Sequence, residues 1–218
     1  MRFFDALFGR SKLPQAKPDK LFALVTAAFT LREEVGWESA GRAGICLKAV
    51  AGSDFLRARE ELEALLKLGV QETGGSVTVT GDEFGYLWVI LSDPDLDDQV
   101  NLVHMATQTL LEHGFGPQLL AAVFRFTPRL SGGTRSAKIG VIGAGMATGT
   151  GAATGAGEGR AYLIYNYKRG NFYPFVPRSE KDKTREFEPE LRVAAELEKE
   201  LPIEKDQTRW FALWNCPV

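Results

Sequence analysis

One apolar segment constrains the fold more than any other part of the sequence. Residues 84–91 read Phe-Gly-Tyr-Leu-Trp-Val-Ile-Leu, so that both faces of a strand formed there would be apolar. A turn signal at residues 81–83 precedes this segment and Pro94 follows it. Because such a run is typical of a strand covered on both faces, it predicts a central strand of a sheet. A chain of 218 residues, 44% hydrophobic, is long enough to bury such a sheet.

Helices and strands are expected on either side of this strand. Apolar residues at helical spacing predict helices over residues 20–35, 54–68, 96–113 and 189–200. Ser53 is the expected N-cap of the second helix and Gly69 its C-terminal stop. Strands are expected over residues 44–51, 77–79, 119–127, 161–167 and 172–175. Since two pairs of neighbouring strands form hairpins, we predict a single α+β domain, with a largely antiparallel β-sheet and helices packed on it.

Two segments stand apart from this domain at residues 21–218. Residues 1–20 are an N-terminal arm and linker, and residues 131–160 are a Gly-rich loop insertion between two strands. Residues 138–149 resemble a dinucleotide-binding fingerprint, but the acidic residue expected about 20 positions later is missing. The helix that the fingerprint requires would also contain several glycines, each costing about 1 kcal/mol relative to alanine. The stretch is too weakly apolar to predict a membrane span.

Charge and cysteine usage limit the partners and the compartment. A formal net charge of -2 gives no general attraction to nucleic acid or anionic membranes. Cys46 lies in an apolar run and reads as a core residue, whereas Cys216 is expected to carry a free thiol. The first residues lack the features of a signal peptide. We therefore expect a cytoplasmic protein in a reducing compartment, with no metal, no cofactor and no nucleic-acid partner.

No set of residues indicates a reaction. His104 and His113 share one predicted helix, but their separation at about 100° per residue places them on opposite faces, where they cannot ligate one metal ion. Neither cysteine has an evident histidine partner, and no Gly-x-Ser-x-Gly or His-Glu-x-x-His motif occurs. We therefore expect binding rather than catalysis. An enzyme whose site is assembled from distant residues is the less favoured alternative.

The N-terminal arm is the first candidate binding element. Phe4, Leu7 and Phe8 fall on one helical face, and Phe3 extends it, while neighbouring arginines and lysines supply positive charge. Such a segment can lie at the surface of an anionic membrane. The alternative is that the arm docks on the protein's own core or on another copy of the chain.

Aromatic residues near the C-terminus are the second candidate. The candidate partner surface consists of Arg169, Tyr173, Phe175, Trp210 and Trp214. Aromatic side chains beside basic ones also occur on surfaces that bind single-stranded nucleic acid, but the chain has no general excess of positive charge. A hairpin whose aromatics cover the sheet, with the tryptophans docking the tail, explains the same residues.

Five stretches, in order along nearly the whole chain, carry a family resemblance. They are residues 4–9 (Phe-Asp-Ala-Leu-Phe-Gly), 84–89 (Phe-Gly-Tyr-Leu-Trp-Val), 114–120 (Gly-Phe-Gly-Pro-Gln-Leu-Leu), 167–175 (Tyr-Lys-Arg-Gly-Asn-Phe-Tyr-Pro-Phe) and 210–214 (Trp-Phe-Ala-Leu-Trp). Together they resemble the PspA-associated family PspAB, and only the Gly-rich stretch 139–159 departs from the family pattern. The resemblance implies association with PspA, a coiled-coil protein of the phage-shock-type envelope stress system that remodels membranes. It implies no catalytic residue.

These observations lead to one functional hypothesis and one alternative. We expect a non-enzymatic adaptor or regulatory protein of the envelope stress response, which associates with PspA and touches the inner face of the membrane peripherally. The alternative is a chaperone-like or general protein-binding α+β domain, monomeric or dimeric, without a membrane role.

Overall fold

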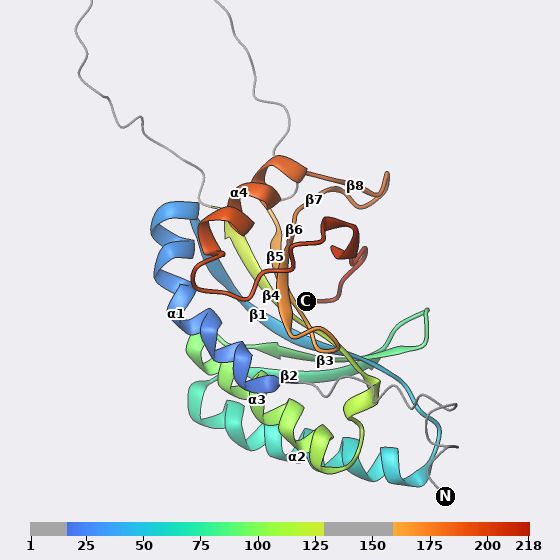
Figure 1. Ribbon diagram of the computed structural model, residues 1–218. Helices are drawn as coiled ribbons and strands as arrows, with labels where there is room; N and C mark the ends of the chain where they lie inside the picture. Colours follow the sequence, from blue (N-terminus) through green and yellow to red (C-terminus); the bar gives the residue numbers. More distant parts are fainter. Residues whose placement is uncertain (1–16, 129–158) are drawn as a thin grey trace, which may run out of the picture.

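The computed structural model describes residues 17–128 and 159–218, which form a layered α+β structure (Figure 1). Within these residues, six strands build one antiparallel sheet in the order β2-β3-β1-β4-β5-β6. The strands are β1 (Trp37–Lys48), β2 (Ser76–Gly81), β3 (Tyr86–Ser92), β4 (Leu119–Pro128), β5 (Ala161–Asn166) and β6 (Asn171–Phe175), with β7 (Pro177–Ser179) and β8 (Thr184–Arg185) in a separate small ribbon. The predicted fold class and the antiparallel sheet are confirmed.

Two helices make the crossovers that this strand order requires. Because neighbouring strands are antiparallel, β1 and β2 run parallel with β3 between them, and β3 and β4 run parallel with β1 between them. Parallel strands need a long connection, which α2 (Ser53–Thr73) and α3 (Leu96–Glu112) provide. The remaining helical segments are η1 (Pro18–Phe22), α1 (Ala23–Thr30), η2 (Leu31–Val35), η3 (Gly116–Gln118), α4 (Phe187–Leu197) and η4 (Gln207–Arg209).

Both faces of the sheet are buried, which explains the apolar sequence of β3. Leu87, Val89 and Leu91 of this strand belong to the core cluster beneath the helices. Trp88 and Ile90 belong to a second cluster that the C-terminal tail covers. Figure 1 shows α1, α2 and α3 on one side of the sheet and the red C-terminal tail on the other. The prediction that residues 84–91 contain an interior strand is confirmed, since β3 pairs with both β1 and β2.

A buried ion pair holds the tail side together. The Glu190 carboxylate of α4 is fully buried, and it accepts hydrogen bonds from the Arg185 Nε (2.9 Å) and from the backbone N–H of Val176 (2.7 Å). The Arg185 Nη1 also donates to the carbonyl of Trp210 at 2.7 Å. One guanidinium therefore joins β8, α4 and the tail.

The caps predicted for the second helix are wrong at both ends. Ser53 is the first helical residue, and Gly52 holds the N-cap position with a φ of 145°. The helix runs through Gly69 and stops at Gly74, whose φ of 77° is the left-handed conformation that favours glycine. A Cβ at Gly69 would lie 2.8 Å from the Cδ2 of Leu102, so this glycine serves the close approach of α2 to α3.

Two further boundaries differ from the predictions. The first strand begins at Trp37 rather than at residue 44. Its first half is polar and contains an irregularity in the pairing with β4 between Ser39 and Arg42, so the sequence pattern there did not indicate a strand. The predicted helix over residues 20–35 is divided into η1, α1 and the π-helical turn η2. Residues 138–149, which resemble the dinucleotide fingerprint, lie outside the described residues. The division into an arm, a domain and a Gly-rich insertion stays a prediction.

Candidate functional site

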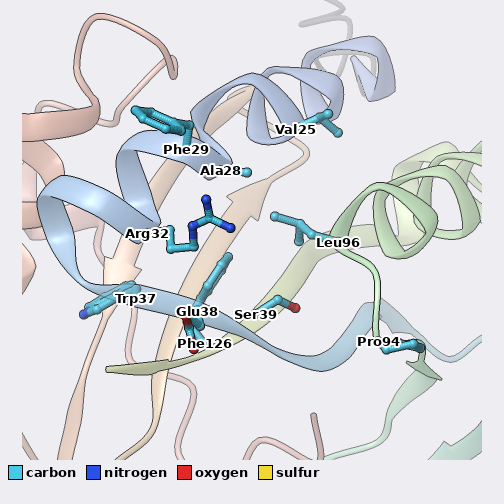
Figure 2. A pocket seen from close by; sticks show the side chains of 10 residues that line it. All are labelled: Val25, Ala28, Phe29, Arg32, Trp37, Glu38, Ser39, Pro94, Leu96 and Phe126. Carbon is cyan, nitrogen blue, oxygen red and sulfur yellow. The ribbon is translucent and has the colours of Figure 1, made fainter. Parts of the chain in front are cut away.

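A groove of about 570 Å³ opens between α1, the first residues of β1 and the start of α3 (Figure 2). Figure 2 shows α1 contributing one wall and Pro94 and Leu96 lying across from it. The groove is lined by Val25, Ala28, Phe29, Arg32, Trp37, Glu38, Ser39, Pro94, Leu96 and Phe126. Most of this lining is apolar, and the charged side chains carry both signs.

The α1 wall exists because this helix is apolar on two faces. One face is buried in the core through Leu24 and Ala27, and Leu21 of η1 and Leu31 of η2 continue it at either end. Val25, Ala28, Phe29 and Arg32 have the spacing i, i+3, i+4, i+7, which places them on a second face. Phe29 is 66% exposed there. The protein thus presents a large aromatic side chain to solvent at the edge of the groove.

Two stacked aromatic rings form part of the lining near the sheet. Trp37 is 4% exposed and Phe126 is 1% exposed, and their ring centroids lie 6.1 Å apart. Ser39 pairs with Phe126 across β1 and β4, after which the register shifts. Gly41 follows with a φ of 70°, and a Cβ there would lie 3.3 Å from the Asp93 carbonyl. The irregularity therefore depends on a glycine at this position.

A buried amide fixes the far wall against β1. The Gln99 side chain is fully buried in the first turns of α3, and its Nε2 donates to the Ser39 Oγ (2.9 Å) and to the Asp93 carbonyl (2.8 Å). The Asp95 carboxylate caps the same helix by accepting from the backbone N–H of Asp97 at 2.8 Å. These bonds position Leu96 on a rigid element rather than on a loop.

The chemistry of the groove suits binding. The Arg32 guanidinium forms an exposed ion pair with Glu33 at 2.8 Å, and the Ser39 hydroxyl already accepts bonds from Gln99 and from the backbone N–H of Gly41. The lining contains no histidine or cysteine. Apolar walls with charges at the rim are the combination that accepts a row of apolar side chains from a partner helix.

None of the predicted site residues in the described part of the chain lines the groove. Phe3, Phe4, Leu7 and Phe8 of the arm lie outside the described residues. Tyr173, Phe175 and Trp210 belong to the second core cluster, which the C-terminal tail covers, and are 3%, 0% and 5% exposed. Trp214 is half-buried, and its ring meets that of Phe175 edge to face at 5.1 Å. A partner could reach Phe175 or Tyr173 only if the tail left the sheet, and their role in partner binding stays a prediction.

Arg169, the charged member of that predicted surface, has a structural partner. Its guanidinium pairs with the carboxylate of Glu204, which is 4% exposed. Burial by itself raises the pKa of Glu204, but the hydrogen bonds from Arg169 and from the backbone N–H of Asp206 outweigh it, so the pKa lies below its ordinary value. This pair attaches the segment after α4 to the β5–β6 turn.

The histidines occupy separate environments. The His104 Nε2 lies 3.3 Å from a carboxylate oxygen of Asp19, and the His113 Nε2 lies 3.1 Å from one of Glu61. Across residues 17–128 and 159–218, no group of three or more histidine, cysteine or acidic side chains is placed to hold a metal ion. None of the helices in that part of the chain has the length and apolarity needed to cross a membrane.

Sequence reasoning missed the groove, although one signal for it was present. The predicted helix over residues 20–35 has more apolar residues than one core-facing stripe requires, and Val25, Ala28 and Phe29 are the surplus. Trp37, Ser39 and Leu96 carry no comparable signal, because only the pairing of β1 and the packing of α3 bring them to α1.

Comparisons with known proteins identify the family. The chain matches PspAB, described as PspA associated protein B, over residues 1–218. No curated protein matches the chain. The match covers the whole chain, including the stretches on which the resemblance was based, and the protein therefore belongs to the PspAB family.

Proposed function

We propose that this protein is a non-enzymatic adaptor that binds PspA, with the groove beside α1 as the docking site. The observation that carries this proposal is the whole-chain match to a family named for its association with PspA. The groove supports it, since it joins an exposed aromatic side chain to an apolar depression with walls on rigid helices and strands.

The proposed occupant of the groove is one amphipathic helix of PspA. A coiled-coil protein presents apolar residues at heptad spacing with charged residues beside them. Val25, Ala28 and Phe29 provide a matching apolar row, and the exposed Arg32 guanidinium can pair with a flanking acidic side chain. Docking of this kind needs no chemical step, and we propose that binding is the whole activity.

The cellular role that we propose is regulation of the envelope stress response. In this role the protein works in the cytoplasm and contacts the inner face of the membrane through Phe3, Phe4, Leu7 and Phe8. Two separate surfaces are then involved, because the arm would bind lipid and the groove would bind PspA. The two activities should be separable by mutation.

The docking proposal is tested by comparing Phe29→Ser with Phe84→Ser. Both phenylalanines are 66% exposed, but Phe84 adjoins the β2–β3 turn, at the Lys48 end of β1, whereas the groove is at the Trp37 end. Burying a phenylalanine contributes roughly 1.5–3 kcal/mol, so the exposed two-thirds corresponds to about 1–2 kcal/mol, or a 5- to 30-fold change in Kd. Biolayer interferometry with immobilised PspA should show this loss for Phe29→Ser alone.

The outcomes separate the parts of the proposal. Equal affinities for the two variants would exclude the groove, and wild-type protein that fails to bind PspA at micromolar concentration would end the adaptor hypothesis. Deletion of residues 1–10 should abolish co-sedimentation with anionic liposomes while leaving the affinity for PspA unchanged. If the deletion does not affect liposome binding, the arm is not the membrane contact.

A further inference from the structure

Two arginines lie directly opposite each other on the tail-facing side of the sheet. Arg42 of β1 pairs with Arg125 of β4, and Arg125 pairs on its other side with Tyr162 of β5. Side chains at directly opposite positions of antiparallel strands have Cβ atoms only about 5 Å apart, and like charges there are destabilising. Both arginines are half-buried, so water screens this repulsion incompletely.

The polar atoms of this row have few partners. The Nε atoms of Arg42 and Arg125 are buried and make no hydrogen bond with the described part of the chain, nor does the hydroxyl of Tyr162, a residue only 1% exposed. One bond does reach the row, from the Arg42 Nη2 to the carbonyl of Pro217 at 3.3 Å. Buried donors without acceptors are rare in folded proteins, because each costs free energy. Three donors on one cross-strand row thus lack an acceptor.

The charged groups near the Tyr162 hydroxyl are mainly positive. Burial and the neighbouring Cys216 raise its pKa, the guanidinium groups of Arg160 and Arg125 lower it, and the Glu180 carboxylate raises it. Glu180 accepts a bond from the backbone N–H of Asn215 at 2.9 Å rather than from either arginine of the row. Glu180 is the one carboxylate among these groups, and its Oε1 is buried without a hydrogen-bond partner in the described part of the chain. The row itself carries two guanidinium groups and no acidic side chain, and its own charge therefore favours an anion.

We propose that Arg42, Arg125 and Tyr162 form a binding site for a phosphate-type oxyanion. A phosphate offers several acceptor oxygens, which suit the planar forks of two arginines and the donor of a phenol. Its negative charge would relieve the repulsion within the row. Both arginines are partly exposed as residues although their Nε atoms are buried, and this partial exposure leaves the anion a route from solvent. The phosphate can belong to a soluble ion or to a phospholipid headgroup. This site is on the face of the sheet opposite the helices and does not depend on the proposed function.

The first test is calorimetric titration of the full chain with inorganic phosphate at constant ionic strength set with chloride. Wild-type protein should show saturable binding, which Arg125→Gln should weaken by about tenfold or more. Arg57→Gln is the matched control, because Arg57 lies on α2 with its side chain 73% exposed. The proposal is overturned if wild-type protein shows no saturable phosphate binding and is also not retained in the vesicle test below. It is equally overturned if Arg125→Gln and Arg57→Gln lose the same amount of affinity for phosphate.

Thermal unfolding distinguishes a ligand site from a purely structural role. If the two arginines form an anion-binding site, Arg125→Gln should be at least as stable as wild type in the absence of phosphate, because it removes the repulsion between them. In saturating phosphate the variant should be less stable than wild type, because it no longer gains stability from the bound anion. A structural role predicts lower stability in both buffers. Tyr162→Phe keeps the packed ring and should weaken phosphate binding without lowering the melting temperature, and it keeps the test decisive if Arg125→Gln fails to fold.

Vesicles identify the source of the phosphate. Retention of wild type, but not of Arg125→Gln, on phosphatidylglycerol vesicles, with displacement by inorganic phosphate, would assign a lipid headgroup. Saturable binding of phosphate without retention on these vesicles would assign a soluble ion. The arm-deleted protein should behave like wild type in the phosphate titration, since none of the three residues proposed to bind the anion belongs to residues 1–10.

Discussion

The ion pair between Arg185 and Glu190 gives the sharpest prediction for stability. Changing Glu190 to alanine would remove the buried acceptor of both the Arg185 guanidinium and the Val176 backbone N–H. The Arg185 side chain is only 12% exposed, so its charge would stay largely without water. The Arg185 guanidinium would still donate to the Trp210 carbonyl, but its positive charge would have no counter-ion.

The size of the effect follows from this burial. Breaking a buried pair by removal of one partner costs about 3–5 kcal/mol. For a chain of this length, each kcal/mol lowers the melting temperature by about 2–4 °C, which gives a decrease of about 6–20 °C for Glu190→Ala. Replacing both partners, as in Glu190→Ala with Arg185→Met, removes the uncompensated charge and should restore part of the lost stability.

Urea unfolding monitored by tryptophan fluorescence measures these differences. Because two of the four tryptophans, Trp210 and Trp214, belong to the tail, a separate early change in emission would show that the tail detaches before the rest unfolds. Arg57→Ala, which removes an exposed ion pair with Asp54, is the control and should have little effect. A loss below about 1 kcal/mol for Glu190→Ala, or a double variant less stable than the single one, would refute the reasoning.

Three further predictions concern the tail side of the molecule. Arg169→Gln should lose stability at neutral pH, because its guanidinium helps to hold the pKa of Glu204 below the ordinary value. A carboxylate with a lowered pKa contributes stability that is lost as the pH falls through its folded-state pKa, so the difference from wild type should shrink as acid protonates Glu204. Melting temperatures followed from neutral to acidic pH check this. Both cysteines are buried, and burial raises the pKa of each thiol to about 12. Neither should therefore react with Ellman's reagent in the native protein. Rapid labelling at mild pH would contradict this. Gly44→Ala should destabilise the fold by about 1–3 kcal/mol in urea titrations, because the new Cβ would lie 2.9 Å from the Val89 carbonyl in the neighbouring strand. An unchanged urea midpoint of unfolding would show that the two strands can move apart to accommodate the methyl group.

Local sequence patterns predicted the elements whose burial is nearly uniform along their length. The apolar run at residues 84–91 predicted an interior strand, and the structure buries β3 on both faces. The range predicted for α3, residues 96–113, also matched closely. The side-chain cap of Asp95 and the left-handed Gly114 fix its two ends, and both act within a few residues. Hairpins with short turns predicted that neighbouring strands pair antiparallel.

Patterns failed where a residue has two physical explanations. Gly69 and Gly74 both suit a helix end, and only the packing of α2 on α3 assigns the first to close approach and the second to the stop. The first half of β1 is polar enough to look like a loop, but pairing with β4 makes it a strand. These choices depend on residues distant in the sequence.

By itself, the sequence determined the α+β class, the interior strand, the family resemblance that the whole-chain match confirmed, and a surplus of apolar residues on the first helix. Only the tertiary structure decided what that surplus lines, because the groove requires α1, β1, β4 and α3 together. It also decided that Arg42 faces Arg125, since the irregularity in β1 sets their register. Secondary structure depends on neighbours within a few positions, whereas binding sites depend on which distant strands and helices come into contact.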